Sequence, residues 1–216
     1  MAEVSTFTDL NELFGRFFAG KNVIDIGGMS GDADGVYPIE KLKRIAKSVT
    51  CVDANRHEKI DMSGIEFHQC KIEDFKADRK FEGAFCGEII EHIGNQEIFL
   101  TKIKDLLRED ATMIFTTPNS SAISDFYRIA MSGVDPRQDM ICERQNGVYL
   151  SGHVVIHNIA TLQQLFYGVG LTITHAFYRR PIGGNIVKQF IRDAILRWRP
   201  YFGSQIVVVA QPSAAA

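Results

Sequence analysis

Residues 22–28 read Asn-Val-Ile-Asp-Ile-Gly-Gly, an apolar run that carries one carboxylate and ends on two glycines. The β-branched residues predict a buried strand, and the glycines allow the backbone after it to approach a ligand closely. The glycine spacing does not match the GxGxxG fingerprint of dinucleotide-binding sheets. We therefore expect a strand that leads into a ligand-binding turn, without a site built for nucleotide phosphates.

Strand-like and helix-like segments alternate from this stretch to the end of the chain, which is typical of a sheet with helices on both faces. Further strands are predicted at 49–54, 66–72, 81–87, 111–117, 171–178 and 205–210. Helical spacing of apolar residues predicts helices at 7–19, 38–47, 96–107, 124–132, 161–168 and 185–198. The prediction is an α/β protein with seven strands, in one open and mostly parallel sheet.

The length of 216 residues predicts one domain. We assign it to residues 1–212, with a lid-like insertion around 119–152, where periodicity is weak, and a disordered tail at 213–216. The 45% hydrophobic and 23% charged residues exclude collagen, coiled coils and wholesale disorder.

Charge and cysteine content predict the setting of the protein. The formal net charge of −2 gives no overall positive field, so we expect no nucleic-acid partner. No apolar run reaches the roughly 20 residues of a membrane span, and no signal peptide is recognisable. The four cysteines form no CxxC pair, and Cys51, Cys70 and Cys86 fall in apolar strand-like runs. We expect reduced, buried thiols and a cytoplasmic location, with a homodimer as an open alternative.

Ligands of open α/β sheets bind beyond the carboxyl ends of the strands. Asp25 and Gly27 end one predicted strand, and Asp53 ends the next, where a carboxylate can accept hydrogen bonds from both ribose hydroxyls. Residues 70–75 and 85–93 include the ends of the next two strands. These four stretches are the candidate site.

The chain resembles the class I S-adenosylmethionine-dependent methyltransferases, in particular small-molecule enzymes such as quinone-biosynthesis and sugar or natural-product O-methyltransferases. The resemblance covers nearly the whole chain and rests on the order and spacing of several short stretches. Its residues lie at 23–27, 52–53, 72–74, 87–93, 117–119, 151–154 and 205–210. It implies a Rossmann-like three-layer sandwich with strand order 3214576 and an antiparallel last strand.

The resemblance also implies that S-adenosyl-L-methionine is the cofactor and assigns roles around it. Asp25 organises the turn, Gly27 and Gly28 pass under the methionine part, and Asp53 with Ala54 binds the ribose. Ile72, with Lys71 or Glu73, flanks the adenine, while Gly87 and Glu88 lie near the sulfonium. Met29 and Lys71 stand where the family usually has a glycine and often has an aspartate.

The transfer needs an acceptor hydroxyl held in line with the methyl group, and a base that takes its proton. An imidazole with a pKa near 6.5 can accept a proton at neutral pH. His153 and His157 follow the lid-like region, and His153 is the favoured base.

Two alternatives stay open. Plant-type small-RNA methyltransferases share the Glu-x-x-Glu-His pattern, so Glu88, Glu91, His92 and His153 can be interpreted as a magnesium site of an RNA ribose methyltransferase. We expect no metal, because this pentapeptide also occurs in metal-free relatives and mixed carboxylate and imidazole ligands are unusual for a hard ion. A non-catalytic module that keeps the sheet is the other alternative.

Overall fold

The computed structural model describes residues 3–7, 9–28, 37–56, 60–133, 143–145, 148–151, 153–179 and 186–213. The strands are β1 (Glu3–Phe7), β2 (Asn22–Ile26), β3 (Ser48–Asp53), β4 (Ile65–Gln69), β5 (Phe81–Gly87), β6 (Leu107–Pro118), β7 (Glu143–Gln145), β8 (Val148–Ser151), β9 (Leu171–Arg179) and β10 (Gln205–Pro212). The helices are α1 (Leu10–Phe18), α2 (Pro38–Ile45), α3 (Gln96–Leu106), α4 (Ile123–Ser132), α5 (Ile159–Gly168) and α6 (Ile186–Trp198), with short 3-10 helices η1 (Ile90–His92) and η2 (Pro200–Phe202).

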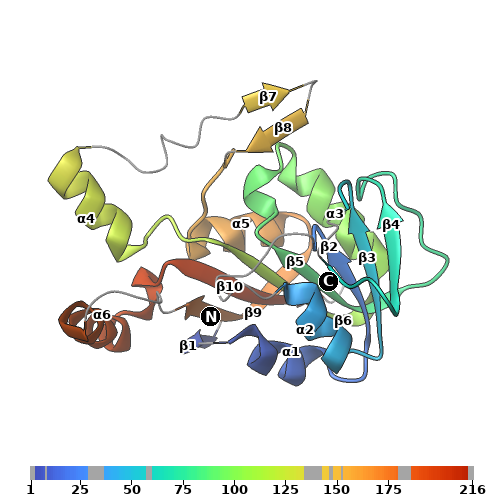
Figure 1. Ribbon diagram of the computed structural model, residues 1–216, viewed down its shortest axis with the longest axis horizontal. Helices are drawn as coiled ribbons and strands as arrows, with labels where there is room; N and C mark the ends of the chain where they lie inside the picture. The colour runs from blue at the N-terminus through green and yellow to red at the C-terminus, as the bar shows by residue number, and fades with distance from the viewer. Residues whose placement is uncertain are drawn as a thin grey trace.

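One sheet organises the molecule, in the order β1-β9-β10-β6-β5-β2-β3-β4 (Figure 1). Without β1, this is the predicted order 3214576, read from β4 to β9. β10 is antiparallel to both of its neighbours, and the pairs among β2 to β6 are parallel. The predicted Rossmann-like topology is confirmed, and the carboxyl ends of β2, β3, β4, β5 and β6 meet at one edge.

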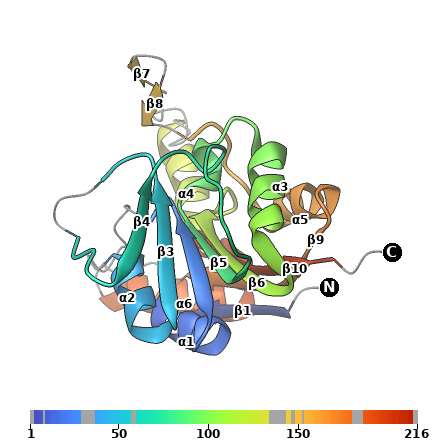
Figure 2. The same cartoon turned by 90° about the vertical axis from the view of Figure 1, so that its right-hand side faces the viewer.

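Alternation of side chains along the strands builds two cores, one on each face of the sheet. Ile24, Ile26 and Val208 face the core that includes α3 and α5. Val23 and Val207 face the other core, which α1 and α2 cover. Figure 2 shows the sheet between these helical layers. The three-layer arrangement follows from the strand period of two residues.

Local signals fix where the helices begin. The Asp9 side chain accepts a hydrogen bond from the Asn11 backbone N–H at 3.0 Å and caps α1. Pro38 opens α2, where its missing N–H costs nothing, and Asn158 and Thr161 form a capping box at α5.

The structure differs from the sequence-based expectations in several places; β6, for example, begins at Leu107 instead of residue 111. The opening helix begins at Leu10 instead of residue 7, because Phe7 belongs to β1, which pairs with β9 and was not predicted. β4 ends at Gln69, so residues 70–72 form a turn instead of continuing the strand. The β7–β8 hairpin lies inside the region expected to be irregular.

The cysteines follow the expected burial in part. Cys51 and Cys86 are buried on strands, and burial raises the pKa of both thiols. Cys70 is only half-buried and lies in the turn after β4. Cys142 lies outside the described residues. Among the described helices, none combines the length and hydropathy that a membrane crossing requires.

Candidate functional site

A cavity of about 400 Å³ opens at the carboxyl edge of the sheet. Its walls come from the ends of β2 and β3, the turn after β4, and the segment after β5, with one ring from α3. The lining residues are Ile26, Gly27, Val52, Asp53, Ala54, Asn55, Cys70, Lys71, Ile72, Glu73, Glu88, Ile89, His92, Ile93 and Phe99. A volume in this range suits a small-molecule ligand.

The structure brings most of the predicted cofactor-binding residues together in this lining. The residues that meet there are Gly27, Asp53, Ala54, Lys71, Ile72, Glu73 and Glu88. Asp25, Gly28 and Gly87 are not in the lining, but each lies within two residues of a lining residue in the chain. Met29 lies outside the described residues.

The turn at Gly27 requires a residue without a side chain. Gly27 has φ +73°, and a Cβ there would lie 2.6 Å from Cδ1 of Ile89. Its backbone N–H donates to the Val52 carbonyl at 3.0 Å, which ties the end of β2 to β3. The backbone of Gly27 therefore reaches the cavity where any other residue would be strained and crowded.

Asp53 presents a carboxylate at the cavity wall. The residue is half-buried at the end of β3, and Oδ1 accepts a hydrogen bond from the Asn55 backbone N–H at 2.8 Å. This bond fixes the direction of the side chain. A fixed, ionised acceptor is the group that binds neighbouring hydroxyls well.

Asp25 is fully buried beneath the turn that follows β2. Within the described part of the chain, neither carboxylate oxygen has a hydrogen-bond partner. Burial and, to a smaller extent, the charge of Asp53 raise the pKa of Asp25 to about 8. A Cβ on Gly28 would lie 2.3 Å from Oδ2 of Asp25, so Gly28 leaves the space that this carboxylate fills.

Glu88 lines the cavity in a strained conformation. Its φ of +50° is rare for a residue other than glycine. The Glu88 backbone N–H donates to the carbonyl and to Oγ1 of Thr116, at 3.0 and 3.1 Å. Oε1 of Glu88 accepts a hydrogen bond from Nε2 of Gln205 at 2.8 Å. These contacts from β6 and β10 hold the Glu88 carboxylate in place, and strain of this kind is common at functional sites.

Near Glu88, three side chains that could bind a metal ion come together from two segments of the chain. One ligand atom each from Glu91, His92 and His153 lies within 4.8 Å of the others. The His92 and His153 rings are 5.0 Å apart. The backbone N–H groups of Val154 and Val155 donate to the Glu91 carbonyl at 2.7 and 3.2 Å. These bonds hold the segment with His153 against η1.

Burial perturbs the titration of this cluster. It raises the pKa of Glu91 to about 8, with a further contribution from Glu88, and it lowers the pKa of His153, with a contribution from His92. Oε2 of Glu91 accepts a hydrogen bond from Oγ1 of Thr117. In contrast, Oε1 of Glu91 and Nδ1 of His153 are buried without a described hydrogen-bond partner. These two orphaned atoms fit either a bound cation or a polar group of a ligand.

His157 lies outside the cavity lining, in a different environment. It is buried, with Nε2 at 3.0 Å from Nε2 of Gln96 and Nδ1 at 3.3 Å from Oγ1 of Thr161. Both ring nitrogens have partners, which favours a role in holding α3 and α5 together. Of the two predicted bases, His153 is the one beside the cavity.

Comparison with known proteins assigns the fold to a family. The sequence profile of a family described as "Methyltransferase domain" matches residues 4–176. The chain belongs to this methyltransferase family.

Relatives of this methyltransferase-family chain agree with that assignment. The ubiquinone biosynthesis O-methyltransferase of Glaesserella parasuis serovar 5 is 28% identical over 117 residues, which cover 48% of each protein. The chain spans about half the length of the curated relatives that it matches.

Solved structures show the same fold at low identity. The DhpI–SAH complex has a TM-score of 0.61 at 13% identity, covering 95% of this chain and 83% of that one. The 1,6-didemethyltoxoflavin-N1-methyltransferase of Burkholderia thailandensis, with its substrate and S-adenosylhomocysteine bound, has a TM-score of 0.56 at 15% identity, covering 91% and 72%.

The sequence interpretation of this methyltransferase-family chain gave several lining residues no role of their own. Cys70, Ile89 and Ile93 lie within the candidate stretches 70–75 and 85–93, where only neighbouring residues were assigned roles. Asn55, in the turn after β3, and Phe99, on α3, lie outside the candidate stretches. The Gln205 bond to Glu88 joins residues 117 positions apart, which sequence spacing does not reveal.

Proposed function

We propose that this protein is an S-adenosylmethionine-dependent methyltransferase that transfers a methyl group to a hydroxyl of a small-molecule acceptor, such as a sugar, a quinone or a natural product. The observation that carries the proposal is the cavity, which is lined by Gly27 and Asp53, taken as its first end, and by Glu88 and His92, taken together with the neighbouring His153 as its second end.

The residues at the first end fit the donor. The fixed carboxylate of Asp53 can accept hydrogen bonds from the ribose hydroxyls, and Gly27 leaves room for the amino-acid part. Ile72 offers an apolar surface for the adenine, with Lys71 and Glu73 beside it. Asp25 lies beneath the turn that follows β2 and shapes it. When bound, S-adenosylmethionine supplies an activated methyl group, so the chain must mainly position the two substrates.

The residues at the second end fit the acceptor. The imidazole of His153 takes the proton from the acceptor hydroxyl while the oxygen forms its bond to the methyl carbon and the bond from carbon to sulfur breaks. A lowered pKa keeps His153 neutral near pH 7, which is the form that accepts a proton. The name of the ubiquinone-biosynthesis relatives, which are O-methyltransferases, supports oxygen as the acceptor atom.

The region 119–152 is proposed as a lid over the acceptor, within a single domain of residues 1–212. α4 and the β7–β8 hairpin lie in this region of the chain, which follows β6. Of the tail expected at 213–216, Ser213 donates its backbone N–H to the Gly170 carbonyl at 2.9 Å, and residues 214–216 lie outside the described residues. The cytoplasmic location, the homodimer and the absence of a nucleic-acid partner stay predictions.

Calorimetric titration with S-adenosylhomocysteine tests the donor end. We expect binding by the natural chain, and a loss of about 1–3 kcal/mol of binding free energy in Asp53→Ala, the cost of hydrogen bonds to a charged acceptor. The control is Asp110→Ala, an exposed carboxylate in an ion pair with Arg108. A folded protein that fails to bind would contradict the proposal and favour a non-catalytic module.

Mass spectrometry tests the acceptor. Cell extract is incubated with the protein and a donor that carries an isotopically labelled methyl group. A labelled small molecule that is absent with His153→Gln would identify the acceptor. Labelled RNA instead would contradict the small-molecule assignment, and a gel-shift series over salt concentration would then measure the phosphate contacts.

One observation favours a second candidate, methyl transfer assisted by a divalent cation, including transfer to RNA ribose. Glu91, His92 and His153 offer three ligands, and two of their buried atoms lack described partners. Dialysis against a chelator, followed by addition of Mg²⁺ or Mn²⁺, separates the candidates. Activity that disappears and returns with the metal would replace the role of His153 as a base by that of a ligand.

A further inference from the structure

The exposed apolar side chains gather on one side of the molecule. Of the ten large hydrophobic residues that are exposed in the described part of the chain, six lie on α4, α6 and η2. We call these six the apolar face: Phe126, Tyr127, Met131, Phe190, Trp198 and Tyr201. Single exposed hydrophobic residues are normal, whereas a gathered set indicates a contact surface.

Ring contacts join two of the three elements that carry the apolar face, α4 and η2. The ring of Phe126 on α4 meets Phe202 of η2 edge to face, with centroids 6.3 Å apart, and Phe202 contacts Tyr201 at 4.6 Å. Figure 1 shows α4 and α6 on the same side of the molecule, away from β3 and β4, and in Figure 2 both helices lie behind the sheet.

α6 turns aromatic side chains toward solvent. Phe190, Ala194 and Trp198 recur every four residues and so share one side of the helix, where Phe190 is 76% and Trp198 is 74% exposed. Leu196 is buried on the other side. A surface helix normally exposes polar residues there. The core of this chain therefore does not account for the aromatic residues of α6.

The same segment is basic in an otherwise slightly acidic chain. Residues 186–199 contain one acid, Asp193, and four basic residues, Lys188, Arg192, Arg197 and Arg199, whereas the whole chain has a net charge of −2. The Arg199 guanidinium lies over the Trp198 ring at 4.3 Å and within 6.0 Å of the Tyr201 ring. Cations are thus placed among the exposed aromatic rings.

We propose that the apolar face docks on an anionic lipid surface. Aromatic residues combined with Arg and Lys on an amphipathic helix are typical of helices that lie in the membrane interface. Trp and Tyr favour the headgroup region, and Arg197 and Arg199 would pair with lipid phosphates. This charge complementarity favours anionic lipid over a neutral apolar partner. The inference does not depend on the proposed methyl transfer.

The chain carries its own probe for this experiment, because Trp198 is its single tryptophan. Fluorescence is recorded with vesicles of phosphatidylcholine alone and with vesicles that also contain phosphatidylglycerol. We expect emission to shift to shorter wavelength, and the protein to co-sediment, only with the anionic vesicles. Salt should weaken the binding. A natural chain that binds neither vesicle, or binds both equally, would overturn the proposal.

Variants locate the binding surface. Phe126→Ser with Phe190→Ser should weaken vesicle affinity by at least about tenfold, because affinity scales with the apolar area buried. Arg197→Glu with Arg199→Glu should abolish the preference for anionic vesicles. The matched control is Ile98→Ser with Tyr167→Ser, which removes two exposed apolar residues of α3 and α5 and should leave binding unchanged.

Two further outcomes would contradict the lipid assignment. An equal loss of vesicle affinity in the control pair would show that non-specific hydrophobic adsorption causes the binding. Self-association of the natural chain that Phe126→Ser with Phe190→Ser removes, without any vesicle binding, would assign the apolar face to an interface between copies. Circular dichroism melting of each variant establishes that it is folded.

Discussion

The two ends of the cavity hold their charged groups in different ways. At the donor end, Asp53 is half-buried, and its direction is fixed by a backbone N–H. At the acceptor end, which we define as Glu88, Glu91, His92, His153 and Gln205, the side chains come from separate segments of the chain, and burial raises the pKa of Glu91 to about 8 and lowers that of His153. The first arrangement suits hydrogen bonds to the hydroxyls of the donor. The second suits proton transfer, because a lowered pKa keeps His153 in the neutral form that accepts a proton.

The largest effect that would test this division is expected at His153. His153→Gln should lower the rate of methyl transfer by about 10²–10⁴-fold, the usual contribution of a general base. The affinity for S-adenosylhomocysteine should stay the same, because the donor end is intact. Rates come from steady-state assays with the identified acceptor, and His68→Gln on β4 is the control. An equal loss of donor affinity would contradict the separate roles of the two ends.

The second effect concerns stability and Asp25, which lies under the donor end. Its pKa is about 8 in the folded chain, against an ordinary value of 3.8. Between these values, the folded chain holds a proton that the unfolded chain releases. The free energy of unfolding should therefore fall as pH rises from about 4 to about 8, by at most about 1.4 kcal/mol per pH unit for one proton.

Urea unfolding of Asp25→Asn across this pH range checks the assignment. The variant should show a flatter dependence than the natural chain, and the residual slope should come from Glu91, whose pKa is raised in the same direction. Asp110→Asn, with an exposed side chain, should keep the natural slope. An unchanged slope in Asp25→Asn would show that this carboxylate is ionised in the folded state.

A smaller effect is expected at Gln205, which holds Glu88 at the acceptor end. Gln205→Met removes the 2.8 Å hydrogen bond and should lower kcat/KM for the acceptor by about fivefold, which corresponds to about 1 kcal/mol. Gln205→Glu should lower kcat/KM further, because it places a second carboxylate beside that of Glu88. Gln211→Met, on the exposed end of β10, is the control.

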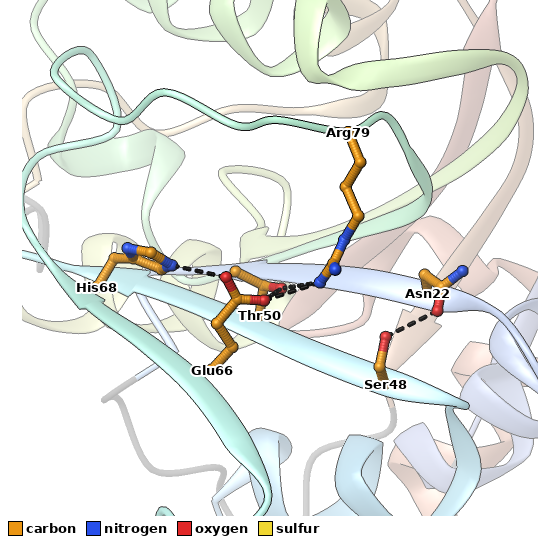
Figure 3. Close-up of polar contacts among 6 residues, drawn as sticks. All are labelled: Asn22, Ser48, Thr50, Glu66, His68 and Arg79. Carbon is orange, nitrogen blue, oxygen red and sulfur yellow. Dashed lines mark hydrogen bonds and ion pairs between the residues drawn. The ribbon is translucent and has the colours of Figure 1, made fainter.

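The smallest effect is expected where neither end is involved. Glu66 on β4 accepts from Thr50 and pairs with Arg79 at 2.7 Å, and both charged side chains are about half exposed (Figure 3). Such pairs contribute about 0–1 kcal/mol, so Arg79→Met should change urea stability by no more than that. Methyl transfer should be unaffected. A reduced rate would link this surface network to the cavity.

Sequence alone predicted most of the sheet because its strands are buried on both faces. Apolar runs such as 22–26 and 81–87 leave no alternative to a central strand, and both are confirmed without a change of bounds. β1 was missed because an edge strand pairs on one side only, and Glu3–Phe7 carries no long apolar run. β7 and β8 are short and lie outside the main sheet.

The candidate site was predictable where it follows a strand directly. Asp53 and Gly27 lie at strand ends, and the topology alone brings them together. The acceptor end is different, because His153 reaches Glu91 through backbone bonds from Val154 and Val155, after a long connection. Gln205 comes from the last strand. The resemblance to small-RNA methyltransferases anticipated the grouping of Glu91, His92 and His153. The bond from Gln205 to Glu88 depends on tertiary packing, so residue type and spacing did not reveal it.

The pairing of β1 with β9 determines when the first strand can fold. Glu3 lies opposite His175, so nearly all of the intervening residues must leave the ribosome before the first strand finds its place. Contacts between such distant residues slow folding. The nascent N-terminal segment would wait unpaired during translation, and its docking onto the sheet would be one of the last steps of maturation.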